Sequence, residues 1–334
     1  MRFQRGVCIY NPTSGGGADE AILRRVGDAL RASVKKVRMV GTEAPNHASE
    51  IAREASAGGA DLIAVLAGDG TVNEVLQGVA GSDAASLLVL PGGTANVLIR
   101  EIGMPREPIG SARMLPALKA RTVSLGLVEF ATGDIRYFLL MCGAGLDAGI
   151  VARTPVRLKH RLGMGAFLVA GAGQVLRRFP RLGVGYTPRP DSGSASSQVM
   201  ISKSRRYGGG MVFTPHANLL SSKFEVAQFA GTSRLPYIGY LLAGMCAKTA
   251  QWPGIRHSAG SELTLVPRGS KPVWLQVDGE VAGTLPAKVS VSSKSLRLLL
   301  PETYATTRQE VGWGKESRLQ EDLVPRPAEH HAGN

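Results

Sequence analysis

The stretch that decides the fold runs from Asp61 to Ile102 and reads DLIAVLAGDGTVNEVLQGVAGSDAASLLVLPGGTANVLIREI. Two short, mainly apolar runs each end in a glycine-rich loop, and a helical pattern follows each loop. The runs are Asp61–Leu66 and Leu87–Leu90, and the helical patterns are Val72–Val79 and Thr94–Ile102. Apolar runs that alternate with helices predict a parallel sheet covered by helices. We therefore expect an α/β fold in this part of the chain.

The same alternation begins nearer the N-terminus. The expected elements there are a strand over Gly6–Tyr10, a helix over Ala18–Arg31, a strand over Val34–Val40 and a helix over His47–Ala57. After Thr122 most of the chain consists of β runs, which predict an antiparallel β-sandwich. These runs are Thr122–Phe130, Ile135–Met141, Val199–Ser202, Lys223–Phe229, Glu262–Val266, Val273–Val277, Lys288–Val291 and Leu296–Leu300.

Two helical insertions interrupt the β runs, at Arg157–Arg178 and Leu235–Ala247, and Pro188–Ser197 reads as a surface loop. The pattern predicts an α/β domain over residues 1–121 and a sandwich domain over residues 122–293. The tail past Pro301 is polar and lacks periodicity, so we expect no regular structure there, and residues 306–334 in particular should be disordered.

The 334 residues carry a formal net charge of +13, which favours anionic partners such as nucleotides, nucleic acid or an anionic membrane surface. Charge alone does not choose among these. We expect no nucleic-acid partner, because no basic run is interleaved with aromatic residues. The longest apolar stretches, near Phe167–Ala172 and Ile238–Cys246, are too short to span a bilayer, so any membrane contact should be peripheral.

Three cysteines, Cys8, Cys142 and Cys246, lie far apart in apolar runs. An odd number of scattered cysteines predicts reduced, buried thiols in a cytoplasmic protein, not a disulfide framework or a metal site.

Three glycine-rich loops each follow an expected strand of the first domain. They are Asn11–Gly17 (NPTSGGG), Ala67–Glu74 (AGDGTVNE) and Pro91–Asn96 (PGGTAN). The carboxyl ends of parallel strands share one edge of a sheet, so the loops should converge there. Glycine backbones approach an anion closely, and a helix N-terminus adds its positive dipole end, so the loops predict a phosphate site. Three hydroxyl groups, those of Ser14, Thr71 and Thr94, could donate hydrogen bonds there.

Two carboxylates are candidates for chemistry. Asp69, between two glycines at a strand end, could hold Mg²⁺ directly or through water, or it could simply cap the following helix. Glu280 follows the dipeptide Asp278-Gly279, which by itself is typical of a hairpin turn. Alternatively, Glu280 faces the nucleotide edge and acts as the general base that deprotonates an acceptor hydroxyl.

Taken in order and spacing, NPTSGGG, AGDGTVNEV, PGGTANVL and VDGE resemble the diacylglycerol kinase catalytic-domain family, which includes sphingosine kinases and bacterial soluble lipid kinases. The resemblance covers about residues 5–300. It implies transfer of a phosphoryl group from ATP to a lipid hydroxyl, with Mg²⁺, at a site between the two domains. It also implies that residues 294–305 return to the first domain.

By motif matching, the resemblance assigns ATP binding to residues of four segments, Asp69 to Mg²⁺ and Glu280 to the catalytic base. The ATP-binding residues are Asn11, Ser14, Gly15, Thr42, Ala67, Gly68, Asp69, Gly70, Thr71, Val72, Asn73, Gly92, Gly93 and Thr94. Asp147 matches a family aspartate that supports the site, or it is a plain turn residue.

The chain departs from the family pattern at several positions. Val97 stands where an aspartate is usual, and no lysine follows the glycines of the first loop. Ser221-Ser222 replaces an Asp-Gly pair whose aspartate helps to hold a second, structural Mg²⁺, so we do not expect that metal here. The alternatives are an NAD kinase, a sugar kinase of the phosphofructokinase type and a non-catalytic, nucleotide-gated lipid-binding protein. The sugar kinase matches the second half poorly, and an NAD kinase predicts neither PGGTAN nor DGE.

Overall fold

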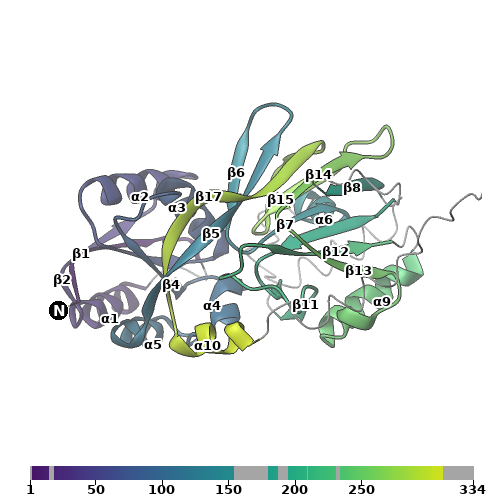
Figure 1. Cartoon of the computed structure of the whole chain (residues 1–334). Helices are drawn as coiled ribbons and strands as arrows, with labels where there is room; N and C mark the ends of the chain where they lie inside the picture. Colours follow the sequence, from purple (N-terminus) through teal and green to yellow (C-terminus); the bar gives the residue numbers. More distant parts are fainter. Residues whose placement is uncertain are drawn as a thin grey trace, which may run out of the picture.

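The computed structural model describes residues 2–14, 19–153, 180–186, 195–208, 210–230 and 234–310. Figure 1 shows an elongated molecule whose first half, at the left, is a helix-covered sheet. The second half, at the right, consists mainly of strands. The expected combination of a parallel α/β half and an antiparallel β half is confirmed.

The first half is built on parallel strands in the order β2, β1, β3, β4. Their bounds are β2 (Val34–Gly41), β1 (Phe3–Tyr10), β3 (Leu62–Ala67) and β4 (Ser86–Pro91). Every residue of β3 and β4 is buried, because helices cover both faces of these central strands. This burial explains why both strands are continuous apolar runs without polar alternation.

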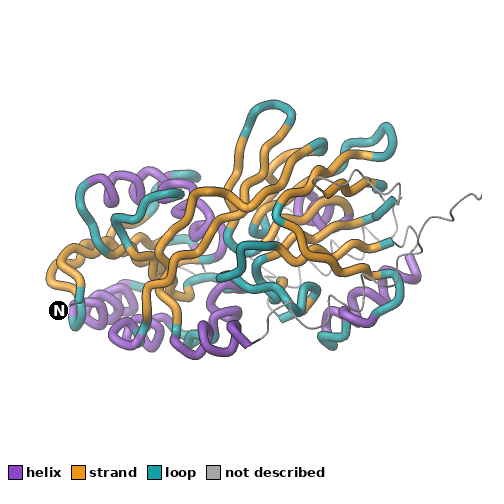
Figure 2. The backbone as a smooth tube through the Cα atoms, in the orientation of Figure 1, coloured by secondary structure: helices purple, strands orange, loops and turns teal. Residues whose placement is uncertain are grey.

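Five helices belong to the first half: α1 (Glu20–Arg31), α2 (His47–Ala57), α3 (Asp69–Val79), α4 (Val97–Ile102) and α5 (Pro108–Arg113). In Figure 2 helices α2 and α3 lie on one face of the strands, and α1 and α5 lie on the other. Helix α2 has the bounds that its periodicity predicts. Helix α3 begins three residues earlier than expected, at Asp69 inside the second glycine-rich loop.

One long strand, β17 (Ala287–Leu300), joins the two halves. Near its end it pairs in parallel with β4, through Arg297 opposite Ser86. Along its length it also pairs antiparallel with β5 (Lys119–Phe130), and at its start with β14 (Glu262–Pro267). The sheet of the first half therefore continues into the second. The sequence predicts two separate strands here, but β17 is continuous and only shifts register against β5 between Val291 and Ser295.

The second half is a sandwich of two sheets, as expected. On one side the continuous sheet adds β6 (Ile135–Phe138) next to β5 and β8 (Leu182–Tyr186) next to β14. On the other side a separate antiparallel sheet has the order β13-β12-β9-β7-β15-β16 within the described residues. Its strands are β13 (Ile255–Gly260), β12 (Phe224–Phe229), β9 (Gln198–Ser202), β7 (Met141–Gly145), β15 (Trp274–Val277) and β16 (Glu280–Thr284).

A compact apolar core fills the space between the two sheets. It includes Val128 of β5 and Val289 of β17 on one side, and Val199 of β9, Val226 of β12 and Leu275 of β15 on the other. All five are fully or almost fully buried. Burial of these β-branched and leucine side chains is the main favourable term that holds the sheets together.

The remaining elements are short or lie at the ends. They are the 3-10 helices η2 (Leu115–Ala117) and η3 (Thr249–Gln251), the strands β10 (Arg206–Tyr207) and β11 (Met211–Val212), and the helices α6 (Leu146–Arg153), α9 (Arg234–Met245) and α10 (Glu302–Glu310). Helix α9 confirms the second expected helical insertion. The first, Arg157–Arg178, lies outside the described residues.

The structure corrects four further sequence-based expectations. The expected strand Ile135–Met141 is two strands, because the chain leaves β6 at Phe138 and enters the other sheet as β7 at Met141. Ser196 and Ser197, expected in a surface loop, are fully buried, and Ser196 pairs with Leu182. Cys246 is exposed, although Cys8 and Cys142 are buried as predicted.

The fourth correction concerns the C-terminal tail. Residues 302–310 form α10 instead of an irregular segment, and Tyr304 of this helix is buried in the core. The Tyr304 hydroxyl donates a hydrogen bond to Glu101 of α4 at 3.3 Å and accepts one from the Leu219 N–H at the same distance. The tertiary contact, not the local sequence pattern, accounts for order in this helix.

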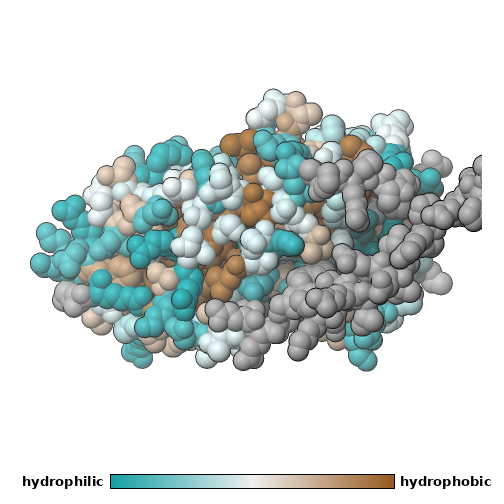
Figure 3. Space-filling view, in the orientation of Figure 1, coloured by the Kyte–Doolittle hydropathy of each residue, from teal (hydrophilic) through white to brown (hydrophobic). Residues whose placement is uncertain are grey.

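Figure 3 shows mostly hydrophilic side chains on the surface of the first half and apolar side chains in the middle of this face. Across the residues that the structure describes, no helix combines the length and the apolar character that crossing a bilayer requires.

Candidate functional site

The three glycine-rich loops meet at the carboxyl edge of the parallel sheet, as the sequence predicts. Ser14 of the first loop is hydrogen-bonded to both of the others. Its hydroxyl donates to the Gly92 carbonyl at 2.8 Å and accepts from the Gly68 N–H at 3.1 Å. The Asn11 amide also donates to the Thr71 hydroxyl at 3.3 Å. Because these side chains bond neighbouring loops, the arrangement is a connected network and not three independent turns.

Glycine is required in the third loop because its backbone lies against the second loop. A Cβ on Gly92 would lie 2.8 Å from the Ala67 Cα, and one on Gly93 would lie 2.5 Å from the Gly68 Cα. Both distances are closer than packed carbon atoms tolerate, and both obstacles are backbone. The sequence suggests that these glycines let a phosphate approach the backbone closely. In the structure they let the third loop pack directly against the second.

Asp69 links the second loop to the start of α4. Its Oδ1 accepts the Val97 N–H at 2.8 Å, so Asp69 caps the helix after the third loop and not its own helix. The pKa of the Asp69 carboxyl is raised to about 6, mainly by burial and to a smaller extent by the nearby charge of Asp278. Backbone N–H groups oppose this effect by stabilising the ionised form; they belong to Val97, Leu98 and Asn96.

The DGE segment is a two-residue hairpin turn between β15 and β16, in which Asp278 and Gly279 both have positive φ, of 47° and 89°. The Asp278 carboxylate accepts four hydrogen bonds of 2.9 Å. Three come from the backbone N–H groups of Leu139, Leu140 and Met141, and one comes from the Asn73 amide. Burial raises the pKa of Asp278, and these donors lower it. Asp278 therefore fixes the hairpin onto α3 of the first half.

The hairpin brings Glu280 to the second glycine-rich loop. A methyl group built on Gly70 would collide with Glu280 Oε1, so the carboxylate lies directly against the first turn of α3. Glu280 itself is exposed. The structure confirms the hairpin turn, and the role of Glu280 as a base stays a prediction. The segment is a hairpin turn, and its glutamate faces the loop that carries Asp69.

A chain of buried polar groups supports the hairpin from inside the sandwich. Asp147, in the first turn of α6, accepts hydrogen bonds from the Tyr207 hydroxyl and, at 3.0 Å, from the Gln276 amide. The Gln276 side-chain oxygen in turn accepts the Gly279 N–H at 2.7 Å. Burial raises the pKa of Asp147, while Tyr207 and Gln276 lower it. Asp147 is therefore linked through Gln276 to the turn that carries Glu280.

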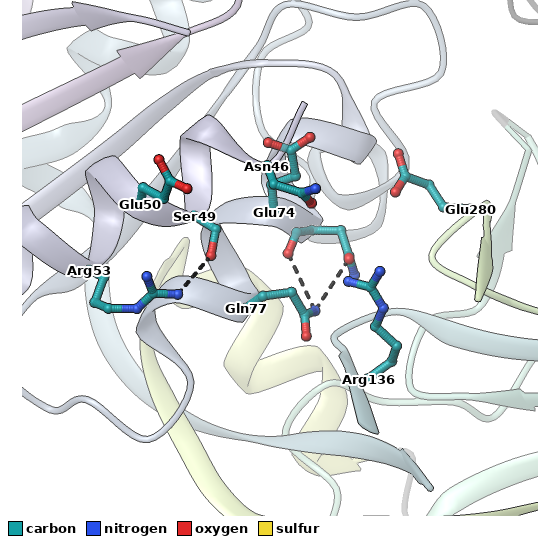
Figure 4. A pocket seen from close by; sticks show the side chains of 9 residues that line it. Asn46, Ser49, Glu50, Arg53, Glu74, Gln77, Arg136 and Glu280 are labelled. Carbon is teal, nitrogen blue, oxygen red and sulfur yellow. Dashed lines mark hydrogen bonds between the residues drawn. The ribbon is translucent and has the colours of Figure 1, made fainter. Parts of the chain in front are cut away.

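A cavity of about 230 Å³ opens next to Glu280 (Figure 4). Its lining residues come from α2 or its N-cap, from α3, and from two strands of the second half: Asn46, Ser49, Glu50, Arg53, Asn73, Glu74, Gln77, Arg136 and Glu280. Figure 4 shows Arg136 and Glu280 on the side opposite Ser49 and Arg53. Gln77 is held in place because it donates to the Tyr137 carbonyl at 2.8 Å. Both halves of the molecule thus contribute to one polar cavity.

The other predicted site residues differ in what their side chains contact. Thr42 follows β2, beside the end of β1, and its N–H donates to the Tyr10 carbonyl at 2.9 Å. The Val72 side chain is buried in the core. Thr94, in the third glycine-rich loop, is exposed. Gly15 lies outside the described residues.

Sequence reasoning missed three kinds of residue. From the sequence Asp278 reads only as a turn residue, but in the structure its carboxylate accepts three backbone N–H groups of the Leu139–Met141 segment. Asn96 also has positive φ, and its side chain bonds the Gly93 backbone at both ends, at 2.9 Å and 2.7 Å. Arg136 belongs to no motif, and only the packing of β6 beside α3 brings it to the cavity.

Ser221 stands at the position where the family pattern has the aspartate of a second metal site. The Ser221 carbonyl accepts a 2.6 Å hydrogen bond from the ammonium of Lys203, which also donates to the Ser124 hydroxyl at 2.9 Å. Lys203 is fully buried, and this burial lowers its pKa to about 8. No cluster of three or more His, Cys, Asp or Glu side chains suited to a metal occurs in the described part of the chain.

The fold and the site agree with one class of protein. Its features are the continuous sheet, the three joined loops and the DGE hairpin. The chain belongs to the family of diacylglycerol kinases and YegS-like lipid kinases, and membership of this family supports a phosphotransferase. The diacylglycerol kinase catalytic domain model matches residues 5–128. The model of the YegS C-terminal NAD kinase beta sandwich-like domain matches residues 143–300.

Two relatives extend along nearly the whole chain. A Pseudomonas fluorescens protein named "Probable lipid kinase YegS-like" is 31% identical over 297 residues, which cover 83% of this chain and 92% of that protein. A Bacillus subtilis protein named diacylglycerol kinase is 25% identical over 306 residues, covering 91% of this chain and 98% of that protein.

Two solved structures share the fold. A diacylglycerol kinase from Bacillus anthracis superposes with a TM-score of 0.66 at 17% identity, covering 91% of this chain and 99% of that one. A yeast NADH kinase in complex with NADH gives a TM-score of 0.52 at 12% identity, covering 98% of this chain and 90% of that one. The NAD kinase alternative is therefore a more distant relative in fold.

Proposed function

We propose that this protein transfers the γ-phosphoryl group of ATP to the hydroxyl group of a lipid, diacylglycerol or a related lipid. The observation that carries the proposal is the contact between Glu280 and Gly70, which brings a carboxylate of the second half against the glycine loop that holds Asp69. A phosphoryl transfer needs a positioned phosphate donor, neutralised charge and a base for the acceptor hydroxyl. The contact between Glu280 and the second loop supports a phosphate site, a carboxylate for a cation and a base at one edge of the sheet.

The joined loops would hold the phosphates of ATP. The N-terminus of α3 adds a partial positive charge, and the exposed Thr94 hydroxyl adjoins the loops. Asn11, Ser14 and Thr71 would act mainly by keeping the loops in register, because the contacts described above already engage their side chains.

The carboxylates around the second loop fit a divalent cation that accompanies the triphosphate. Asp278 raises the pKa of Asp69 through its charge, and the Glu280 carboxylate lies against Gly70, the next residue of the loop. Like charges gathered in this way are relieved by a cation, and Mg²⁺ commonly uses only one or two carboxylates together with phosphate oxygens. Asp69 would hold the ion, directly or through water. The ion would neutralise charge that develops on the transferred phosphoryl group.

Glu280 would act as the base. Its carboxylate would accept the proton of the lipid hydroxyl while that oxygen forms a bond to the γ-phosphorus. The bond between the γ-phosphorus and the bridging oxygen then breaks, ADP leaves with that oxygen, and the lipid phosphate is the product. The charge on Asp278 and the links from Asp147 through Gln276 would keep the hairpin, and so Glu280, in position.

The cavity beside Glu280 would receive the nucleoside end of ATP. Its volume of about 230 Å³ is below the roughly 300–1,000 Å³ of a complete small-molecule site, which suits one part of a nucleotide. Asn46, Ser49 and Glu50 of its lining could bond to polar groups of a base and ribose, while Glu280 lies at the second glycine-rich loop. The guanidinium groups of Arg53 and Arg136 line the same cavity, so its charge is mixed. Asn46→Ala should therefore weaken ATP binding and leave tripolyphosphate binding unchanged, as measured by calorimetry.

The decisive experiment is transfer of label from γ-labelled ATP to a panel of dispersed lipids, with NAD as a further acceptor. The wild type should label a lipid. Glu280→Gln and Asp69→Asn should each lower the rate by about 10²–10⁴-fold, the range that a general base contributes. Undiminished labelling in both variants would show that the assigned site is wrong. Label on NAD would favour the NAD kinase alternative, and ATP binding without any transfer would favour a non-catalytic lipid-binding protein.

A further inference from the structure

Helix α9 presents an apolar face to solvent at the end of the second half. Three of its side chains, Ile238, Leu242 and Met245, are 48%, 53% and 67% exposed. Their spacing of four and three residues places them in one row along the helix. We call this row the α9 face. In Figure 1 helix α9 lies at the lower right, beside β13 and far from the first half.

The fold does not use the α9 face, because the opposite side of the helix makes the contacts to the sandwich. Tyr237, Tyr240 and Ala243 are buried, and the Tyr240 ring packs edge-on against Phe229 of β12 with centroids 5.3 Å apart. Removal of the exposed side chains would therefore leave this packing in place. A contiguous row of exposed, large apolar side chains is unusual in a soluble domain unless something covers it.

The surrounding sequence indicates what covers it. From Val226 to Ser261 the chain contains no Asp or Glu, while Arg234, Lys248 and Arg256 lie in this segment. Lys248 follows shortly after the helix and is exposed. The Trp252 ring lies against the helix, where a Cβ on Gly239 would be 3.2 Å from its Cζ2, and Trp252 is half-buried.

The exposed apolar row, the basic residues without acidic neighbours in the segment, and the adjacent tryptophan suit an anionic bilayer surface better than a protein surface. An interfacial helix combines large apolar side chains on one face with basic residues beside them. Tryptophan is enriched at the level of the lipid headgroups. A segment without acidic residues avoids repulsion by anionic lipids, and each basic residue near the surface adds to the attraction.

We propose that α9 docks this protein on anionic membranes by inserting the α9 face among the lipid headgroups, with Lys248 beside it. The proposal rests on the proposed function for its partner, since a lipid acceptor lies in a bilayer. It assigns the docking surface to α9. The other expected helical insertion, Arg157–Arg178, which contains several Arg and Lys residues, lies outside the described residues.

Cys246 offers a direct test, because it follows Met245 and is exposed, whereas Cys8 and Cys142 are fully buried. An environment-sensitive dye attached to Cys246 of the full chain should become brighter and shift to the blue with phosphatidylcholine vesicles that contain phosphatidylglycerol. The control is a Cys246→Ser, Ile135→Cys variant, which carries the dye at a 50% exposed position on β6. There the signal should not change. An unchanged signal at Cys246 on vesicles that do sediment with the protein would overturn the proposal.

Substitutions in and near α9 test how much these side chains contribute to vesicle association, measured without ATP. Leu242→Ser combined with Met245→Ser should lower vesicle association at least about tenfold, because partly inserted apolar groups are lost. Lys248→Gln should lower it about fivefold at low salt and less at high salt. Ile135→Ser, the matched exposed change, should have no effect. Full association of the Leu242→Ser, Met245→Ser variant would refute the inference. So would a wild type that ignores vesicles but forms dimers that this variant cannot form.

The two proposals fail in different ways. The Leu242→Ser, Met245→Ser variant should phosphorylate a short-chain, water-soluble acceptor at the wild-type rate and lose activity only on vesicles. If the wild type phosphorylates no lipid but its dye at Cys246 still responds to anionic vesicles, only the proposed function fails. If lipid phosphorylation is normal and the dye does not respond, only the docking inference fails.

Discussion

The Asp278 carboxylate accepts a hydrogen bond from the Asn73 amide at 2.9 Å, across 205 residues of sequence. Asn73 belongs to the first helical turns after the second glycine-rich loop, and Asp278 belongs to the hairpin that carries Glu280. The bond therefore connects the glycine loops of the first half directly to the proposed base of the second. Movement of one half against the other would have to break it.

Replacement of Asp278 should destabilise the fold. In Asp278→Asn an amide NH₂ would face backbone N–H donors of the Leu139–Met141 segment, which leaves buried polar groups unpaired. We expect the free energy of unfolding to fall by about 1–3 kcal/mol in chemical denaturation. Glu280→Gln, two residues away and exposed, is the control and should change it by less than about 0.5 kcal/mol. Equal effects in the two variants would contradict the assigned role of Asp278.

Gly70→Ala should separate activity from stability. The added methyl group meets only the end of the Glu280 side chain, which can swing away, so the fold should tolerate it. Alanine also favours the helix over glycine by about 0.8–1 kcal/mol. A displacement of the base by about 1 Å should lower phosphoryl transfer about a hundredfold.

The measurement is the transfer rate together with the unfolding midpoint. Gly210→Ala is the control, since a Cβ at Gly210 has open space around it, and it should change neither quantity. Full activity of Gly70→Ala would argue that the position of Glu280 is unimportant.

The ionisation of Asp69 should make cation-dependent nucleotide binding sensitive to pH. Burial raises the Asp69 pKa from its usual value near 4 to about 6. Between these values the folded chain holds a proton that the unfolded chain has released, so this group lowers stability as pH rises through the interval. A bound cation requires the ionised form, so affinity for ATP with Mg²⁺ should rise as pH increases through about 6.

Calorimetric titration below and above this pH tests the point in wild type and in Asp69→Asn. The variant should bind weakly, without the rise that Asp69 contributes. The comparison between the two proteins is needed because burial also raises the pKa values of Asp278 and Glu101. An identical pH profile in the variant would exclude Asp69 as the titrating group.

Lys203 should produce the opposite trend at alkaline pH. Its folded-state pKa of about 8 is below the value near 10.4 of an exposed lysine, so between these values the unfolded chain binds more protons. The free energy of unfolding should therefore gain about 3 kcal/mol from this group as pH rises through that interval. Lys203→Met should lack this contribution, and denaturation at neutral and alkaline pH measures it. Lys223→Met, which replaces an exposed lysine, should keep the wild-type trend.

Local sequence was sufficient to predict the elements whose burial follows one regular pattern along their whole length. The β3 and β4 strands are continuous apolar runs because both faces are buried, and α2 has the bounds that its period predicts. It failed where a distant partner decides. The β17 strand reads as two runs because its middle, at the register shift between Val291 and Ser295, is less buried than its ends. The α10 helix reads as an irregular tail because the burial of Tyr304 depends on distant partners.

By itself the sequence determined the three glycine loops, their common edge and the Asp-Gly turn before Glu280, since turn chemistry and strand order act over a few residues. Only the tertiary structure decided that Ser14 bonds both other loops, that Asp278 holds Asn73, and that α9 keeps an apolar face exposed. The physical reason is that hydrogen-bond partners and burial depend on how two sheets pack, and no local pattern of residues contains that information.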